Sequence, residues 1–470
     1  MKRRDALKTG VSLAALGYLY PLRSMAGVSA NDKIQVGCIG LGGMGRGDMR
    51  DFLSHDDCEV VAVCDVDENH LNESRDEVKE KSGKTPDAYG DFRELLARDD
   101  IDAVMIGTPD HWHCPIAALA CQSGRHVYVE KPLGQNIHEA RLAVDSAKAN
   151  GCITQMGTQV HQTENYHRAV DLVKTGKLGE ISKVRFWIAS NNAPEGLGNP
   201  PDTEPPEELN YNFWLGGAPM RPYNVKRSHF SWRYFWDYGG GWLGDMGCHI
   251  LDPVFWALDL DMPNKVTAMG GRYVVHDIAE VPDTQEAIWQ FPPLEGRKEP
   301  FQIVWSLTAG NEQGIESQGR GFMFCGTEGT LLVDYGFYKH FDKKGELVEE
   351  FRPEDDSLGN AGKNHKREFL DGIRTNTRTS CDIEYGHKLT TVLHTGNIAT
   401  RVCKVLDWDG EKEQFTNDQE ANKYVSRDYR EGWSPKELGL KVGDAMTKSD
   451  KAFTSPHSYK ERYPIRLREA

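Results

Sequence analysis

The stretch Ile34-Gln35-Val36-Gly37-Cys38-Ile39-Gly40-Leu41-Gly42-Gly43-Met44-Gly45 decides the fold of the first part of this chain. Mostly apolar residues typical of a buried parallel strand run directly into a G-x-G-x-x-G turn. When a helix follows such a turn, main-chain N–H groups can approach a pyrophosphate, and the helix N-terminus stabilises its charge. The spacing alone is weak evidence, because a chain with 47 glycines also forms ordinary glycine turns.

A second buried-strand pattern, from Glu59 to Cys64, ends in Asp65, which lies 20 residues after Gly45. A carboxylate at this distance accepts hydrogen bonds from the adenosine ribose and repels a 2′-phosphate, so it favours NAD over NADP. The next residues, Val66 and Asp67, add no basic group. The alternative is a solvated acidic residue at a strand end.

The length of the chain bounds the number of its domains, and its net charge limits the kinds of molecule that it binds. A chain of 470 residues predicts two or three domains. Its 71 acidic and 56 basic residues give a net charge of −15, which argues against nucleic acid or an anionic membrane as partner. A neutral polar ligand fits better.

The first 30 residues predict a targeting signal rather than part of the fold. The segment 3–8, Arg-Arg-Asp-Ala-Leu-Lys, resembles a twin-arginine export motif, although Ala6 stands where Phe is usual. An apolar run over 11–22 follows, and 28–30 offers small residues for cleavage. The run is too short to span a bilayer, so we expect no stable membrane insertion after cleavage. The alternative is a basic amphipathic helix of a cytoplasmic protein.

Export through this route predicts a periplasmic or otherwise exported protein that crosses the membrane already folded. Free NAD is scarce outside the cytoplasm. We therefore expect the NAD to be tightly bound and recycled in place.

The ten cysteines form no C-x-x-C pair, and several lie in apolar runs. This pattern is typical of small buried side chains, and it predicts no metal site. It leaves open whether an oxidising compartment joins any two of them.

Two more strand patterns end in polar segments. The strand over 101–107 ends in Thr108-Pro109-Asp110-His111-Trp112-His113, and the strand over 126–129 ends in Glu130-Lys131-Pro132. Ligands of a doubly wound sheet bind at such strand ends. A lysine fixed there by a following proline is aimed into the cleft.

The motifs G-L-G-G-M-G, C-D-V-D, T-P-D-H-W-H and E-K-P-L, in this order and at these strand ends, resemble the Gfo/Idh/MocA oxidoreductases, named after glucose-fructose oxidoreductase and inositol dehydrogenase. The resemblance covers most of residues 31–400. It implies an N-terminal Rossmann domain with a doubly wound parallel sheet (α/β) and a C-terminal α+β domain on an open, largely antiparallel sheet.

We therefore expect a signal peptide over 1–30, an NAD-binding Rossmann domain over 31–155, a substrate and oligomerisation domain over 156–405, and a C-terminal wrapping segment over 406–470. The exposed face of the second sheet predicts a homo-oligomer. The proline-rich segment 191–208 predicts a long ordered surface loop near the sugar site.

The aromatic stretch from Trp232 to Trp242 indicates either core or a surface on which sugar rings stack. We expect substrate binding by Arg233, Asp237 and Tyr238.

Asp245 and His249 are four residues apart and share one face of a helix, which indicates a surface hydrogen bond or a catalytic pair. Pro253 in the same helix leaves the carbonyl of His249 without its usual donor. In the resembled family, an Asp and a His at this spacing join the E-K-P lysine. The resemblance therefore implies Lys131, Asp245 and His249 as the catalytic group.

His249 has a reference pKa near 6.5 and is the expected base, while Lys131 stabilises a developing alkoxide and Asp245 orients either. Their roles could be exchanged. The resemblance also implies a set of cofactor-binding residues: Gly40, Leu41, Gly42, Gly43, Met44, Gly45, Asp65, Thr108, Pro109, His113, Glu130, Lys131 and Gln159.

Three functions remain open at this point. The first is an exported NAD-dependent dehydrogenase acting on a secondary hydroxyl of a sugar or glycoside. The second is a redox-neutral glycosidase that oxidises the sugar transiently, eliminates the aglycone, adds water and re-reduces. The third is a non-catalytic sugar-binding protein.

Overall fold

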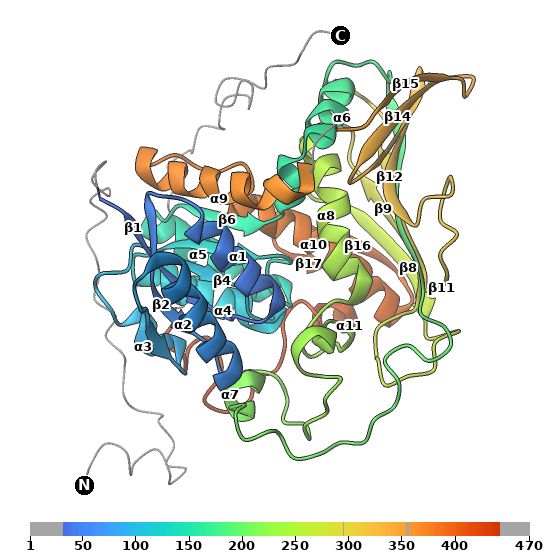
Figure 1. The fold of residues 1–470 in the computed structure, drawn as a ribbon. Coiled ribbons are helices and arrows are strands. Elements are labelled where there is room, and N and C mark those ends of the chain that lie inside the picture. The colour runs from blue at the N-terminus through green and yellow to red at the C-terminus, as the bar shows by residue number, and fades with distance from the viewer. Residues whose placement is uncertain (1–31, 295, 354–356, 442–470) are drawn as a thin grey trace, which may run out of the picture.

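The computed structural model describes residues 32–294, 296–353 and 357–441, which form two sheets flanked by helices (Figure 1). The predicted signal peptide lies outside the described residues. Among the residues described, no helix combines the length and apolar character needed to cross a bilayer.

The first sheet is parallel, with strand order β3-β2-β1-β4-β5-β6. The order reverses between β1 and β4, and this switch point opens a crevice at the carboxyl ends of the strands. The predicted Rossmann domain is confirmed. Its strands are β1 (Ile34–Ile39), β2 (Cys58–Cys64), β3 (Asp87–Tyr89), β4 (Ala103–Ile106), β5 (His126–Glu130) and β6 (Thr154–Gly157).

Helices cover both faces of this sheet, because its strands are apolar on both sides. They are α1 (Gly43–Leu53), α2 (Glu68–Ser82), α3 (Phe92–Leu96), α4 (Asp110–Gln122) and α5 (Ile137–Asn150). A later helix, α9 (Ser357–Thr375), also packs here, and Phe369, Leu370 and Ile373 enter the core under β1.

The second sheet has eleven strands, and β7 with β10 is the parallel pair among those described. The predicted largely antiparallel sheet is thus confirmed. Its strands are β7 (Ile181–Asn191), β8 (Lys265–Gly271), β9 (Thr284–Phe291), β10 (Phe301–Thr308), β11 (Gly310–Asn311), β12 (Arg320–Gly326), β13 (Gly329–Asp334), β14 (Phe337–Asp342), β15 (Leu347–Phe351), β16 (Val405–Asp409) and β17 (Gln414–Phe415).

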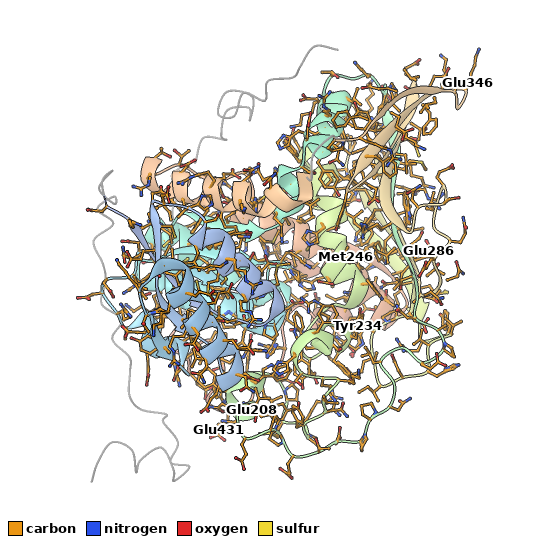
Figure 2. The ribbon with its side chains drawn as sticks, in the orientation of Figure 1. Glu208, Tyr234, Met246, Glu286, Glu346 and Glu431 are labelled. Carbon is orange, nitrogen blue, oxygen red and sulfur yellow. The ribbon has the colours of Figure 1, made fainter. Side chains whose placement is uncertain are left out.

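The long helices α8 (Gly241–Leu258) and α10 (Ile383–Val402) lie between the second sheet and the first domain (Figure 1). The shorter helix α6 (Glu164–Lys174) packs on α8, β13 and β14. The opposite face of the sheet carries exposed side chains such as Glu286 (Figure 2). The shorter elements are η1 (Gln159–Gln162), α7 (Tyr211–Leu215), η2 (His229–Tyr234) and α11 (Gln419–Asn422).

The sheet continues past residue 405, where we expected the second domain to end. β16 pairs with β8, so the described start of the C-terminal segment extends the sheet rather than wrapping it. Further on, Arg427 and Arg430 hold the chain against the first domain and α7 through Glu139, the carbonyl of His111 and Asn212.

All ten cysteines lie in the described part of the chain, and none is joined in a disulfide. Seven of them are buried, as small apolar side chains are.

Candidate active site

The glycine turn brings α1 against the sheet more closely than any side chain would allow. Gly40 has φ +80°, and a Cβ there would lie 2.5 Å from the main-chain nitrogen of Thr108. A Cβ on Gly45 would lie 1.9 Å from the carbonyl oxygen of Gly40. The first and last glycines of the motif are therefore required by the turn and by helix–strand packing, as in a dinucleotide-binding turn.

Asp65 lies at the end of β2 beside this turn. Its Oδ2 accepts the N–H of Leu41 at 2.6 Å, and its Oδ1 accepts the N–H of Asp67 at 2.9 Å. Burial raises the pKa of Asp65, and these main-chain donors oppose that rise. The carboxylate is fixed at the edge of the cavity, in the position that suits a ribose diol.

A cavity of about 650 Å³ follows the strand ends from Asp65 to Lys131. Its size is that of a small-molecule or cofactor site. The predicted cofactor residues Gly42, Gly43, Met44, Thr108, Pro109, His113 and Glu130 line it. The glycine cradle, the Asp65 carboxylate and the cavity fit NAD together.

Three predicted cofactor residues lie elsewhere. The Leu41 side chain is fully buried in the core under α1, and Gly45 serves packing. Gln159 is not among the lining residues; its amide nitrogen lies 3.8 Å from the sulfur of Met44, and its Oε1 has no partner. His113 faces the cavity, but its ring nitrogens contact the carbonyls of Pro132 and Thr108 at 2.8 and 2.7 Å, so it holds two loops together.

The second domain forms the opposite wall of the cavity, of which the sequence analysis indicated Trp232 and Arg233. The N–H of Asn210 donates to the carbonyl of Val66 at 2.9 Å, and Leu209 bridges to Asp67. The chain just after the loop predicted over 191–208 thus pairs with the end of β2, and the predicted position of that loop near the sugar site stays a prediction. This wall comprises Leu209, Phe213, Trp214, Phe230, Trp232 and Arg233.

Lys131 lies at the far end of the cavity and is 8% exposed. Its ammonium pairs with the carboxylate of Asp245 and donates to the main-chain carbonyl of that residue at 3.1 Å. The guanidinium of Arg233 contacts the same carboxylate, with Nε 3.2 Å from Oδ1. Two cations from different domains therefore meet on Asp245.

These contacts fix the charge of each group. Burial alone would raise the pKa of Asp245, but Lys131 and Arg233 outweigh it and hold that pKa well below its usual range. Burial would lower the pKa of Lys131, and Asp245 outweighs burial and raises it. At neutral pH Lys131 is an ammonium and Asp245 a carboxylate.

His249 lies one turn after Asp245 on α8. Burial, with the charge of Lys131, lowers its pKa to about 3, so the imidazole is neutral. Its Nδ1 is buried and has no partner. Pro253 removes the usual donor to the carbonyl of His249, as predicted, and the hydroxyl of Tyr166 approaches that carbonyl at 3.5 Å instead.

Of the three predicted substrate residues, Arg233 alone lines the cavity. Asp237 pairs with Arg221 at 2.9 Å, and Tyr238 is fully buried with its ring 4.8 Å from that of Trp214. Asp237 and Tyr238 therefore do not line this cavity, and their role in substrate binding stays a prediction. Their aromatic stretch is core at Tyr238 and Phe235 and cavity wall at Trp232.

Asp110, the first residue of α4, is a buried carboxyl that we did not predict. It is 2% exposed, and its Oδ1 has no partner. Burial raises the pKa of Asp110 well above its usual range, although Arg233 and Lys131 oppose that rise.

Comparisons with known proteins agree with both domains. A model described as "Oxidoreductase family, NAD-binding Rossmann fold" matches residues 34–158. A model described as "Oxidoreductase family, C-terminal alpha/beta domain" matches residues 186–301 and 341–435. Together they match more than two thirds of the chain.

Two Shewanella proteins named glycosyl hydrolase family 109 protein resemble parts of the chain. The protein from Shewanella pealeana is 33% identical over 207 residues, which are 38% of this chain and 44% of that protein. The protein from Shewanella baltica strain OS155 is 32% identical over 158 residues, which are 32% of this chain and 34% of that protein. The chain thus spans less than half the length of these relatives.

Solved structures share the fold at low identity. Levoglucosan dehydrogenase in complex with NADH and levoglucosan has a TM-score of 0.59 at 16% identity, covering 80% of this chain and 99% of that one. The WlbA dehydrogenase from Bordetella pertussis, in complex with NADH and UDP-GlcNAcA, has a TM-score of 0.58 at 18% identity, with 80% and 99% covered.

Proposed function

The chain belongs to the Gfo/Idh/MocA family of oxidoreductases, and we propose that it is an NAD-dependent enzyme acting on a secondary hydroxyl of a sugar or glycoside. One observation carries the proposal. Lys131 from the first domain and Asp245 from the second are in contact at the end of the cofactor cavity, with His249 one turn further along α8.

Lys131, His249 and Asp245 each have a separate role in the reaction of one substrate hydroxyl group, set by their protonation states. The Lys131 ammonium donates a hydrogen bond to the reacting oxygen and stabilises the developing alkoxide. The neutral imidazole of His249, whose Nδ1 has no partner, accepts the hydroxyl proton. Asp245 keeps Lys131 protonated and fixed. NAD, when bound, supplies the carbon that accepts hydride.

A base with a pKa of about 3 holds a proton weakly. The reference value near 6.5, from which we chose His249 as base, does not apply in this buried site. His249 is therefore unprotonated at neutral pH, as a group that accepts the hydroxyl proton must be.

A redox-neutral glycoside hydrolase is the second candidate. The Shewanella relatives bear the name of a glycosyl hydrolase family. A protein that works where free NAD is scarce also benefits from regenerating its cofactor in each turnover. Transient oxidation, elimination, hydration and re-reduction would use the same three side chains.

Product analysis distinguishes these functions. Purified protein with its bound cofactor, and none added, is incubated with a panel of glycosides. A keto-sugar formed in amounts that match the cofactor supports the dehydrogenase. A free reducing sugar formed over many turnovers supports the hydrolase. Binding of a glycoside without either product would support the third function, a sugar-binding protein, and refute catalysis.

We propose that the bound cofactor is NAD rather than NADP and that it stays in place through purification. The Asp65 carboxylate beside the ribose position and the wall from the second domain support this. Denaturing extraction of the mature protein should release close to one nicotinamide dinucleotide per chain. An extract without nicotinamide would refute tight binding.

We also propose export by the twin-arginine route and cleavage after residue 30. The mature chain would then begin at Asn31. Intact-mass measurement of the natively secreted protein tests this, and a full-length chain retained in the cytoplasm would refute it.

A further inference from the structure

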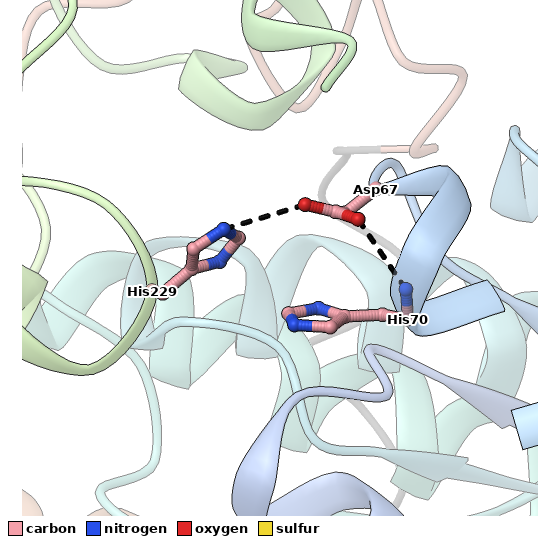
Figure 3. Close-up of side chains that lie close together, drawn as sticks. All are labelled: Asp67, His70 and His229. Atoms are coloured by element: carbon pink, nitrogen blue, oxygen red, sulfur yellow. Dashed lines mark hydrogen bonds and ion pairs between the residues drawn. The ribbon is translucent and has the colours of Figure 1, made fainter. Parts of the chain in front are cut away.

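Three metal-ligating side chains lie together where the second domain meets the end of β2 (Figure 3). Asp67 and His70 belong to the first domain, at the start of α2, and His229 begins η2 of the second. One ligand atom from each lies within 4.8 Å of the other two. We propose that Asp67, His70 and His229 bind a divalent transition-metal ion of the zinc class, which joins the two domains.

Asp67 is already fixed for this role. Its Oδ1 accepts the N–H groups of Asn69 and His70 at 2.9 and 3.3 Å and so caps α2. Its Oδ2 faces Nε2 of His229 at 3.3 Å. Two ligands of a tetrahedral zinc ion lie about 3.4 Å apart when each bond is about 2.1 Å long. The carboxylate and the His229 imidazole therefore stand at ligand spacing.

His70 completes the set with a small movement. Its ring centroid lies 4.8 Å from that of His229, and Figure 3 shows the two rings beside the Asp67 carboxylate. The ligand atoms lie within 4.8 Å of one another, so a movement of at most about 1.4 Å brings the widest pair to the spacing of about 3.4 Å in a tetrahedral site. Asp65 Oδ2 lies 3.8 Å from His70 Nδ1, beyond hydrogen-bond distance, and would accept the second N–H of a ligating His70 only after the same movement.

The donor set selects the metal. Two imidazoles and one carboxylate suit zinc, nickel or copper, whereas magnesium and calcium prefer oxygen ligands throughout. Three protein ligands leave a fourth position for water. The side chains of His70 and His229 are 28% and 43% exposed, so the ion has a path from solvent.

An ion bound to these three side chains would fix the position of the cavity wall that the second domain forms. All three ligands line the cavity, and the residues just after His229 include Phe230, Trp232 and Arg233 of the opposite wall. A metal that fixes His229 therefore holds this wall over the glycine turn. The effect on the cofactor rests on the proposed function, whereas metal binding itself does not.

The test uses the purified full chain with the cofactor that it retains. This protein is dialysed against a chelator and then titrated with zinc chloride by calorimetry. We expect about one equivalent to bind. Asp67→Asn should keep the helix cap, because asparagine is also a good N-cap residue, but lose a ligand. It and His229→Ala should weaken binding by more than about 100-fold, since loss of outer partners alone costs 10–100-fold.

His276→Ala, which removes an exposed imidazole elsewhere in the second domain, is the matched control and should bind zinc normally. Cobalt in place of zinc should give tetrahedral visible bands without thiolate charge transfer. Thiolate bands would instead place the metal at the buried group of His161, Asp252 and Cys381 and overturn the proposal. So would well under half an equivalent of zinc on the wild type, or unchanged binding by folded Asp67→Asn and His229→Ala proteins.

Discussion

The ammonium of Lys131, at the end of β5, contacts both the carboxylate and the main-chain carbonyl of Asp245 on α8. This contact joins the two domains at the end of the cofactor cavity. It sets the protonation state on which the proposed chemistry depends.

Lys131→Met and His249→Ala should each lower kcat by at least about 100-fold while leaving NAD binding within a few-fold, because each removes a group that acts on the reacting oxygen. Steady-state rates and the fluorescence of bound NADH measure the two effects. His276→Ala should leave both unchanged. Near-normal rates in either catalytic variant would refute the assignment.

Asp245→Asn should move the alkaline limb of the kcat/KM profile to lower pH. Burial and Arg233 lower the pKa of Lys131, and the Asp245 carboxylate outweighs them in the wild type. Without that charge the ammonium loses its proton at lower pH, by about one unit or more. A lower rate with an unmoved profile would show that Asp245 has only a structural role.

Asp65→Asn should reduce the preference for NAD over NADP. The amide oxygen keeps the acceptor for the Leu41 N–H in the turn, while the Asp67 N–H loses its acceptor, and the neutral amide no longer repels a 2′-phosphate. The ratio of the two dissociation constants, measured by calorimetry on cofactor-free protein, should fall by about tenfold. An unchanged ratio would mean that Asp65 does not select the cofactor.

Lys366→Met should destabilise the protein by about 3–5 kcal/mol, because it leaves Asp48 buried without its partner. The two side chains, 0% and 1% exposed, lie 2.5 Å apart between α9 and α1. Denaturant unfolding measures the loss, and adding Asp48→Asn should restore part of it. Glu77→Gln, at the surface pair with Arg50, is the control and should cost no more than about 1 kcal/mol.

Met269→Asp should dissociate the proposed homo-oligomer. In the sheet register, Val405, Thr267 and Ile288 form one row, and Met269 lies two residues along on the same face. Met269 is 70%, Val405 54% and Ile288 38% exposed, so three apolar side chains face outward, with Glu286 paired opposite Met269. Light scattering should show the wild type as an oligomer and the variant as a monomer. A monomeric wild type would refute the proposal.

The parts of the site that could be predicted from the sequence are the residues that directly follow a predicted strand. The glycine turn, Asp65 and Lys131 each follow a strand, and parallel strands bring their carboxyl ends to one edge. Asp245 and His249 were placed by helical spacing together with the resemblance. Neither argument requires knowing which distant segments meet.

The features that were missed depend on distant segments. Phe213 and Trp232 reach the cavity because the loop before them pairs with the end of β2. The hydrophobic periodicity of the sequence does not predict which distant segments pair. Tyr238 and Asp237 lie among similar aromatic residues, where composition cannot separate a core side chain from a ligand contact. The charge of Lys366 is neutralised by a residue more than 300 positions away.

The position of α9 also constrains how the chain acquires its structure during synthesis. The residues that bury the underside of β1, among them Phe369 and Leu370, are translated some 200 residues after β6 is complete. Until they leave the ribosome, the nascent first sheet exposes an apolar face and an uncompensated Asp48. The first domain therefore matures only when nearly the whole polypeptide has emerged, and a gene truncated after residue 158 should yield an aggregating fragment.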